Sequence, residues 1–403
     1  MLQSSEAQAE PQSQPRATIA SGLLLTVVAW FCSRLVVGAW GPARNPFSPT
    51  LAQWSHWDSV NYLAISVYGR TFGACGSRAF PASAFTRYLH LRWCGTAQWL
   101  PGYPWLIRAT HTTGYATTDA AVVISWVALA SAMFLVWFGW GRDLSVGRAF
   151  VLLLLFGLFP GAVYNFALFP TSLALAFEIG ALLCAARARL LPAALLMTLA
   201  GLCYPTAWCA AIALVIGLAI MAIPLGRAMI VRRALWGVAG LGSLVVLGVH
   251  DQLAFHHFDA FFLAVDQRRA RPSGFPGLDF LRLIFTQNTI AQDSIGSFSG
   301  AILAAQALLA IALVIAAAAV TRSWWRRKER DPMQLYPALT GVIVAASLVV
   351  VSTGGAWNRS IVLAAPCVVC LRKAPLLLLC AIIVAAGTCA ALIAHPFFEN
   401  LLV

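Results

Sequence analysis

Charged side chains are scarce in this chain of 403 residues, in which 10% of residues are charged and 60% are hydrophobic. Soluble domains are closer to about 25% charged and 45–50% apolar. The shortage of charge therefore excludes an ordinary soluble globular protein and predicts a polytopic membrane protein. Lysine occurs only as Lys328 and Lys373, and we draw no functional conclusion from this preference for arginine.

Acidic residues are also few, with 14 against 27 basic residues and a formal net charge of +13. In a soluble chain this excess of positive charge would suggest nucleic acid as a binding partner. In a membrane protein it indicates orientation in the bilayer and contact with anionic lipids. The basic run after Trp324 and Trp325 is interpreted in the same way, as an anchor at the inner face. We expect membrane lipids, and no nucleic acid, among the partners.

Motifs for nucleotides, cofactors and metals are absent from the sequence. No GxGxxG or P-loop stands between a strand and a helix, so no cofactor is predicted. The ten cysteines lack zinc spacing, and we expect Cys367 and Cys370 to be buried thiols in an apolar segment. His256, His257 and Asp259 would point in different directions from a helix, so we predict no metal site.

Two cysteines, Cys75 and Cys94, differ from the others because they fall in the first long loop. They can form a disulfide if that loop is extracytoplasmic, since disulfides persist in oxidising compartments. The sequence alone leaves both the oxidised and the reduced state open.

Long apolar runs fill most of the chain after a polar beginning. Residues 1–17 are predicted to be a disordered cytoplasmic tail, and residues 18–403 a single integral membrane domain. The first run, Thr18–Trp40, is too long for a signal-peptide core and is interpreted as an uncleaved span. Eleven spanning helices are expected to start near Thr18, Asp119, Ala149, Thr171, Leu191, Thr206, Ala234, Ser299, Leu335, Ser360 and Pro375.

Basic residues follow a consistent pattern between these spans. With the N-terminus in the cytoplasm, every basic short loop falls on the cytoplasmic side. The opposite side receives the long loops 41–118 and 256–298 and the turns 169–171, 203–205 and 354–359. Pro205 is predicted to mark a tight hairpin or a broken helix, because proline removes a helical hydrogen bond. Within the first loop, Trp105–Ala109 is too short to span and is expected to lie at the interface. The pattern predicts that the working face is extracytoplasmic, and the expected location is a bacterial plasma membrane.

One acidic residue, Asp58, lies in the first loop with six arginines. These are Arg44, Arg70, Arg78, Arg87, Arg92 and Arg108. Around Asp58, residues 56–68 carry Val60, Leu63 and Val67 at helical spacing, which predicts an amphipathic helix on the membrane surface. Asp58 would occupy its first turn, where the helix dipole favours a carboxylate. The side chain is a candidate proton acceptor, and the structural alternative is a helix cap or a pair with a loop arginine.

Two motifs in this loop resemble a known family. His56-Trp57-Asp58-Ser59 and, later, Leu100-Pro101-Gly102-Tyr103-Pro104 are similar to the HWD and FFP-x-(F/Y)-P motifs of the PIG-V family of GPI-anchor mannosyltransferases and its bacterial relatives. Weaker similarity continues through residues 159–165, 172–173, 257–267 and 357–359, so the resemblance covers most of the chain. It implies an all-α polytopic GT-C fold with an extracytoplasmic site. It also implies a polyprenyl-phosphate sugar donor, with mannose as the default sugar.

Such a transferase needs a base on the acceptor hydroxyl, a cation on the leaving phosphate and an apolar path for the isoprenoid tail. We predict Asp58 as the general base of an inverting reaction on a lipid, glycan or protein acceptor. Arg359 is the predicted phosphate contact because arginine binds phosphate bidentately; Arg268 and Arg269 are alternatives. Other candidate substrate contacts are His56, Trp57, Trp99, Tyr103, Gln267 and Asn358. Packing or interfacial anchoring is the alternative for the aromatic and histidine members.

Departures from the family pattern and one acidic residue in a predicted span leave two alternative functions open. Phe169-Pro170-Thr171 stands where the family has Tyr-Ser-Glu, and the missing glutamate leaves a catalytically silent scaffold open. Glu178 lies within a predicted span, where an ionisable residue is costly and a functional candidate by default. It suggests either a transporter or flippase for a lipid-linked or polar substrate, or a protonated side chain that is hydrogen-bonded to a neighbouring helix.

Overall fold

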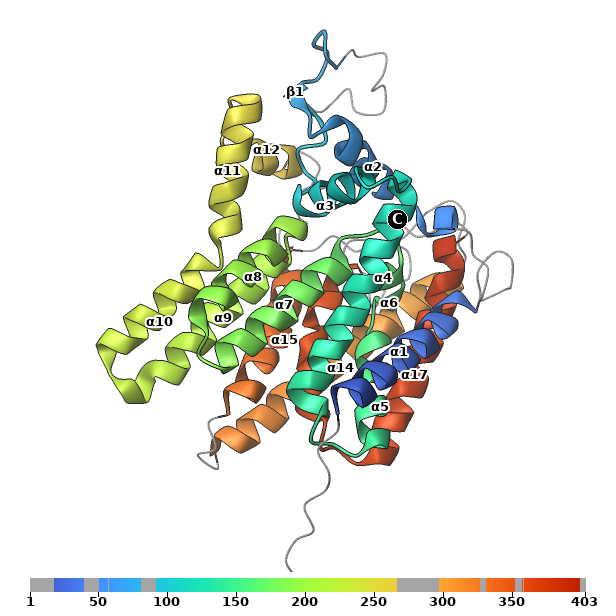
Figure 1. The fold of residues 1–403 in the computed structure, drawn as a ribbon, viewed down its shortest axis with the longest axis vertical. Coiled ribbons are helices and arrows are strands. Elements are labelled where there is room, and N and C mark those ends of the chain that lie inside the picture. Colours follow the sequence, from blue (N-terminus) through green and yellow to red (C-terminus); the bar gives the residue numbers. More distant parts are fainter. Residues whose placement is uncertain are drawn as a thin grey trace, which may run out of the picture.

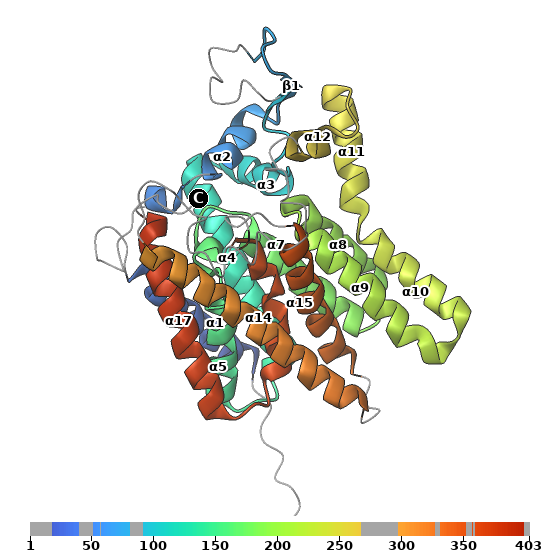
Figure 2. The same cartoon turned by 180° about the vertical axis from the view of Figure 1, so that it is seen from behind.

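The computed structural model describes residues 18–39, 51–56, 58–80, 92–266, 297–326, 331–351, 357 and 359–398. Within these residues the chain is a helical bundle with a small cap at one end (Figures 1 and 2). Six of the described helices are long and apolar enough to cross a membrane, or seven if one bent pair counts as a single span. The prediction of an all-α integral membrane protein is therefore confirmed.

The bundle is built from helices of two lengths. The long ones are α1 (Ile19–Gly38), α4 (Thr117–Val136) with the π-helical turn η4 (Trp137–Gly141), α9 (Ala207–Ala222) with the 3-10 turn η5 (Ile223–Leu225), α14 (Ser297–Arg326), α15 (Pro332–Val351) and α17 (Leu376–Phe398). The shorter apolar ones are α5 (Val146–Gly157), α7 (Thr171–Ala186), α8 (Leu190–Cys203) and the 3-10 helix η6 (Ile361–Leu371). Each predicted span start falls at or inside a helix. The count of eleven spans stays a prediction, because the shorter helices do not reach the length of a full crossing.

One predicted span is divided in the structure. The span expected from Ala234 is formed by α10 (Arg227–Ala239) and α11 (Gly242–Phe255), which are bent by 41° at a short break. The break contains Gly240 and precedes Gly242, and glycine disfavours continuation of a helix more than any residue except proline. α10 packs beside α8 and α9, whereas α11 leaves the bundle toward the cap (Figure 1).

Local sequence explains where several helices begin and end. The Thr18 hydroxyl accepts a hydrogen bond from the Ser21 amide and caps α1. Pro205, predicted to mark a hairpin or a broken helix, lies in a tight turn between α8 and α9, which pack together. Gly102 opens α3 (Gly102–His111) against the end of α8, where an added Cβ would lie 2.8 Å from the Leu202 carbonyl oxygen. These features bring the first loop close to the α8–α9 turn.

The centre of the bundle is η6, in which every residue is buried. It packs against α5, α7, α14 and α15. Its continuous apolar sequence fits this position, since a helix surrounded by other helices has no polar face. Cys367 and Cys370 lie within it as buried free thiols, as expected.

The basic end of the bundle is defined by the connections that carry most of the arginines that the structure describes. At this end the Trp140 indole donates to the Met333 carbonyl at 2.6 Å, and Arg148 donates to the Ala374 carbonyl at 3.1 Å. These bonds join connections that are distant in sequence. The basic residues in or beside these connections are Arg142, Arg148, Arg187, Arg189, Arg227, Arg232, Arg233, Arg322, Arg326, Arg372 and Lys373.

The opposite, capped end carries short elements that lie across the bundle (Figure 1). They are η1 (Leu51–Trp54), α2 (Ser59–Tyr68), α3, α6 (Ala162–Phe166), α12 (Ala260–Asp266) and a two-stranded antiparallel sheet of β1 (Phe72–Ala74) and β2 (Trp93–Gly95). The helix predicted over residues 56–68 is present as α2. The small sheet was not predicted, and the Cys75–Cys94 disulfide links the residue after β1 to the middle residue of β2.

Glu178 occupies the middle of α7 and is fully buried. Within the described part of the chain neither carboxyl oxygen has a hydrogen-bond partner. The predicted hydrogen bond from Glu178 to a neighbouring helix is therefore not formed among the described residues.

Candidate functional site

Asp58 stands at the start of α2, in the N-cap position. Its backbone carbonyl accepts hydrogen bonds from the amides of Asn61 (3.0 Å) and Tyr62 (3.1 Å), but its side chain makes no capping bond. The Ser59 hydroxyl donates to the Leu168 carbonyl at 2.9 Å, which ties the beginning of α2 to the α6–α7 connection. The backbone thus holds Asp58 in place and leaves its carboxylate available for another partner.

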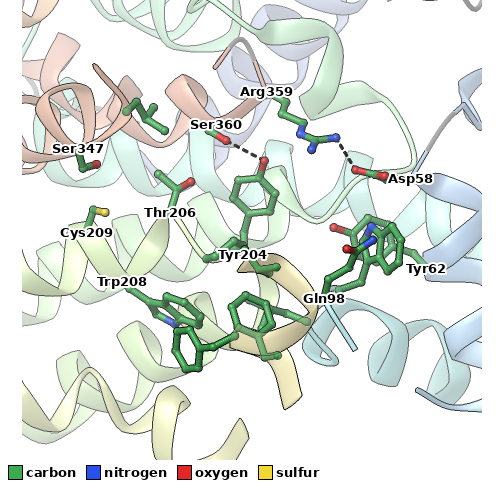
Figure 3. A pocket seen from close by; sticks show the side chains of 17 residues that line it. Asp58, Tyr62, Gln98, Tyr204, Thr206, Trp208, Cys209, Ser347, Arg359 and Ser360 are labelled. Carbon is green, nitrogen blue, oxygen red and sulfur yellow. Dashed lines mark hydrogen bonds and ion pairs between the residues drawn. The ribbon is translucent and has the colours of Figure 1, made fainter. Parts of the chain in front are cut away.

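That partner is Arg359, which lies 301 positions later in the chain. The Arg359 guanidinium donates a hydrogen bond to Asp58 Oδ2 and forms an ion pair with it (Figure 3). Arg359 directly precedes the buried helix η6, between the fully buried Trp357 and the buried Ser360. The Asp58 and Arg359 side chains remain 23% and 31% exposed. The pair is therefore accessible, which a purely structural core pair would not be.

Nearby charges and burial shift the pKa of Arg359 in opposite directions. Burial lowers the pKa of its guanidinium, whereas Asp58 and the nearby phenols of Tyr204, Tyr62 and Tyr164 raise it, and the net shift is upward. Arginine at this position therefore carries its positive charge at any working pH. A fixed cation with part of its surface exposed is able to receive an anion.

A cavity of about 410 Å³ opens beside this ion pair. Asp58, Tyr62, Gln98 and Trp99 contribute from the cap, and Arg359 contributes from the turn before η6. The remaining wall is formed by Leu100, Tyr204, Pro205, Thr206, Trp208, Cys209, Phe261, Phe262, Val265, Ser347, Leu348 and Ser360. The cavity thus combines charged groups, hydroxyls and aromatic rings in one open space, as ligand sites commonly do.

Tyr204 adds a polar group to the cavity wall. Its phenol is hydrogen-bonded to the Ser360 hydroxyl at 3.0 Å (Figure 3). Burial raises the pKa of both Tyr204 and Tyr62 above the ordinary value for a phenol. Both therefore stay protonated and are able to donate hydrogen bonds to a ligand. The bond between Tyr204 and Ser360 also holds the turn that carries Arg359.

A second cavity of about 420 Å³ adjoins the first and is almost entirely apolar. Phe261 and Phe262 of α12 belong to the walls of both cavities. The other walls are Leu244, Val245, Leu247, Gly248 and Phe258. An apolar space next to a polar one suits an amphiphilic ligand, because each part of the ligand meets a matching surface.

The structure brings together three of the predicted site residues, Asp58, Arg359 and Trp99, at one cavity. Trp57, Gln267, Arg268, Arg269 and Asn358 lie outside the described residues. His56 and Tyr103 are described, but neither lines this cavity.

His56 and Tyr103 have packing contacts instead. The His56 ring meets Phe397 edge to face, with centroids 5.0 Å apart. Tyr103 is fully buried, and its phenol donates to the Ala121 carbonyl at 2.7 Å and is hydrogen-bonded to Ser125 at 2.8 Å. In this arrangement the Tyr103 ring cannot stack on a sugar. The α2–α3 packing that buries it could not be inferred from the motif alone.

The first-loop arginines that the structure describes do not pair with Asp58. Arg70 binds Asp251 and the Ala97 carbonyl, and Arg108 donates to the Ser66 carbonyl at 2.6 Å at the end of α2. These described arginines therefore stabilise the cap. The cation that meets Asp58 comes from the opposite end of the sequence.

The sequence did not identify six polar residues of the cavity wall, which are Tyr62, Gln98, Tyr204, Thr206, Ser347 and Ser360. Two of them carried a usable signal, since Tyr62 lies one helical turn after Asp58 and Tyr204 precedes Pro205 at a predicted outer turn. Within the described residues, no group of three His, Cys, Asp or Glu side chains is arranged to hold a metal ion.

Comparison with models of protein families finds no match, and comparison with curated proteins finds none either. The geometry of this site is therefore the basis for inferring a function.

Proposed function

We propose that the protein is a membrane glycosyltransferase that transfers a sugar from a polyprenyl-phosphate donor to an acceptor hydroxyl. The observation that carries this proposal is the accessible Asp58–Arg359 pair on the wall of a cavity that adjoins an apolar one. A lipid-linked sugar phosphate is an anion with a polar head and an apolar tail. The head matches the cavity lined by charged and hydroxyl groups, and the tail matches the apolar cavity.

Arg359 is proposed to bind the donor phosphate. Its fork of N–H groups matches phosphate oxygens in a bidentate manner. Without substrate the guanidinium is paired with Asp58. A phosphate competes for the same donors, so binding of the donor would loosen the pair and turn the Asp58 carboxylate toward the acceptor. Substrate binding would thereby prepare the base.

Asp58 is proposed to act as the general base. It takes the proton of the acceptor hydroxyl as that oxygen forms a bond to the anomeric carbon. The bond from the anomeric carbon to the phosphate oxygen breaks at the same time, and its electron pair remains on the phosphate, which Arg359 stabilises. Attack from the side opposite the leaving group inverts the anomeric configuration. General-base help of this kind contributes about 10²–10⁴-fold to a rate.

The remaining walls suit the other parts of the substrate. The Trp99 ring is proposed to contact the sugar face, with Gln98 and Tyr204 supplying hydrogen bonds to its hydroxyls. Phe261 and Phe262 lead to the apolar cavity, which is proposed to hold the isoprenoid. The identity of the sugar as mannose follows from the resemblance of the motifs around His56 and Tyr103.

The reaction is proposed to take place on the extracytoplasmic face of the plasma membrane. Two observations support this orientation. The disulfide between Cys75 and Cys94 lies at the capped end with the cavity, and disulfides persist in oxidising compartments. The arginine-rich connections lie at the other end, as cytoplasmic loops do.

A transporter or flippase is the second candidate, favoured by the buried Glu178 in the middle of α7. One assay separates the two functions. Purified protein in vesicles is given radiolabelled polyprenyl-phosphate mannose together with membrane lipids. A new labelled product that depends on Asp58 supports the transferase, whereas label that crosses the membrane without a new bond supports transport.

The assay needs a carboxylate control. Asp259 at the capped end is suitable, since its side chain is 55% exposed and it does not line the cavity. Asp58→Asn should lose product formation, whereas Asp259→Asn should retain it. Normal turnover by a well-folded Asp58→Asn protein would refute the proposed role of this residue.

A further inference from the structure

We infer that a groove at the basic end, on the face of α14 beside α15, binds an anionic phospholipid through its phosphate and one acyl chain. The groove has a volume of about 730 Å³. Val314, Ile315, Ala318 and Val342 form its apolar part, and Arg322 and Arg326 stand at its end. This site lies at the opposite end of the bundle from Asp58, so the inference does not depend on the proposed reaction.

The two arginines are arranged as a pair. They are four residues apart on one helix, which places them one above the other on the same face. Both are exposed, and within the described part of the chain neither makes an ion pair or a side-chain hydrogen bond. Two adjacent cations of this kind attract an anion.

Three other basic residues at this end are already engaged. Arg372 lies 3.9 Å from Asp331, Arg148 donates to backbone carbonyls, and Arg187 lies over the Phe138 ring. Arg322 and Arg326 differ from these because their charge is directed to a hollow surface. Charge complementarity at this groove therefore favours an external anion.

The length of the groove matches half a bilayer. From Val314 to Arg326 the helix rises about 18 Å, at 1.5 Å per residue. Half of the hydrocarbon core measures roughly 15 Å. An acyl chain that follows Val314, Ile315 and Ala318 would therefore bring its phosphate to the level of Arg322 and Arg326. Ser323 also lines the groove, but its hydroxyl already donates to the Val320 carbonyl at 2.7 Å, so the phosphate is bound by the two arginines.

The walls also select the kind of anion. A wholly polar phosphate would gain nothing from the apolar part of the groove, whereas a lipid tail fills it. A zwitterionic headgroup would bring its own cation close to two guanidiniums. The geometry thus points to a lipid with a net negative charge, such as phosphatidylglycerol.

The test compares lipid binding by the full-length protein and by two charge-matched variants. Purified protein in detergent is titrated with fluorescent phosphatidylglycerol or phosphatidylcholine. The test variant is Arg322→Gln with Arg326→Gln. The control is Arg189→Gln with Arg227→Gln, which removes the same charge from exposed positions at the same end. We expect the test variant alone to lose roughly tenfold or more in affinity for phosphatidylglycerol.

A second arm tests the apolar part. Ala318→Trp fills the groove and leaves both arginines in place, so it should also weaken binding of phosphatidylglycerol. Glycerol phosphate, which has the anion without the tail, should compete poorly. The inference is overturned if phosphatidylcholine binds as well as phosphatidylglycerol, if the arginine variant binds like the control, or if glycerol phosphate competes as effectively as the lipid.

Discussion

Two arginine–aspartate pairs at the capped end have the same chemistry and different surroundings. In the Arg70–Asp251 pair the side chains are only 1% and 0% exposed. Asp251 also accepts a hydrogen bond from the Phe261 amide at 3.2 Å, and Arg70 also donates to the Ala97 carbonyl. In the Asp58–Arg359 pair about a quarter to a third of each side chain is exposed, on the wall of a cavity.

The difference separates a structural pair from a candidate functional one. Arg70 joins the end of α2 to α11 through Asp251 and His250, and Asp251 accepts the Phe261 amide at the beginning of α12. A ligand cannot reach this pair, because both side chains are buried. Asp58 and Arg359 keep exposed surface, so a ligand is able to replace one partner by another. We conclude that accessibility, not the presence of an ion pair, marks the site.

The largest expected effect is on activity at the open pair. Asp58→Asn preserves shape and removes the base, so transfer should fall by about 10²–10⁴-fold. The melting temperature should change little, because both side chains are partly exposed and solvent screens their ion pair. Steady-state transfer and thermal unfolding in detergent, measured on the same preparation with Asp259→Asn as control, test this separation.

The second effect is on stability at the closed pair. Asp251→Asn leaves the buried Arg70 charge uncompensated, and removal of one partner of a buried pair costs about 3–5 kcal/mol. We expect a markedly lower melting temperature, with turnover per folded molecule changed less than in Asp58→Asn. Equal stability of Asp251→Asn and wild type would show that the two pairs do not differ as described.

A third effect concerns the sheet next to the closed pair. Cys75 and Cys94 are separated by 19 residues, and a crosslink of this length stabilises a protein by about 3 kcal/mol in the chain-entropy model. The double variant Cys75→Ser with Cys94→Ser should therefore unfold at lower temperature. The double variant Cys380→Ser with Cys389→Ser, which removes two free cysteines of α17, is the matched control. An unchanged melting temperature in the first variant would contradict this role.

The smallest effect tests the geometry of the open pair. Arg359→Lys keeps the charge but loses the planar fork, and we expect a loss of about tenfold in kcat/KM for the donor, a change of roughly 1.4 kcal/mol. Arg92→Lys, at an exposed position outside the cavity, should behave like wild type. Full activity of Arg359→Lys would mean that a point charge suffices.

Much of the fold was predictable because it depends on local properties. Apolar runs predicted the helices, and the Tyr204-Pro205 sequence predicted an interruption where α8 turns into α9. Short helices such as η6 were located, but their length does not establish a crossing. The strands β1 and β2 were missed because three-residue strands have too little periodicity to detect.

The sequence predicted some residues of the candidate site but not how they are arranged. Asp58, Arg359 and Trp99 were selected from motif and position, and they line one cavity. Tyr103 was selected by the same reasoning and is buried beside Ser125. Tyr204 was noted only as part of a turn. Which aromatic ring faces a cavity depends on how α2, α3 and the α8–α9 turn pack. The sequence of one segment does not specify which other segments pack against it.

The sequence by itself determined that this is a helical membrane protein, since hydropathy and charge are properties of each segment alone. It also determined that the unusual polar residues gather in the loops at one side of the predicted spans. Only the tertiary structure decided that Asp58 meets Arg359 while Arg70 meets Asp251. The physical reason is that side chains far apart in the sequence become neighbours through the packing of whole helices, and burial then decides which pair stays open to a ligand.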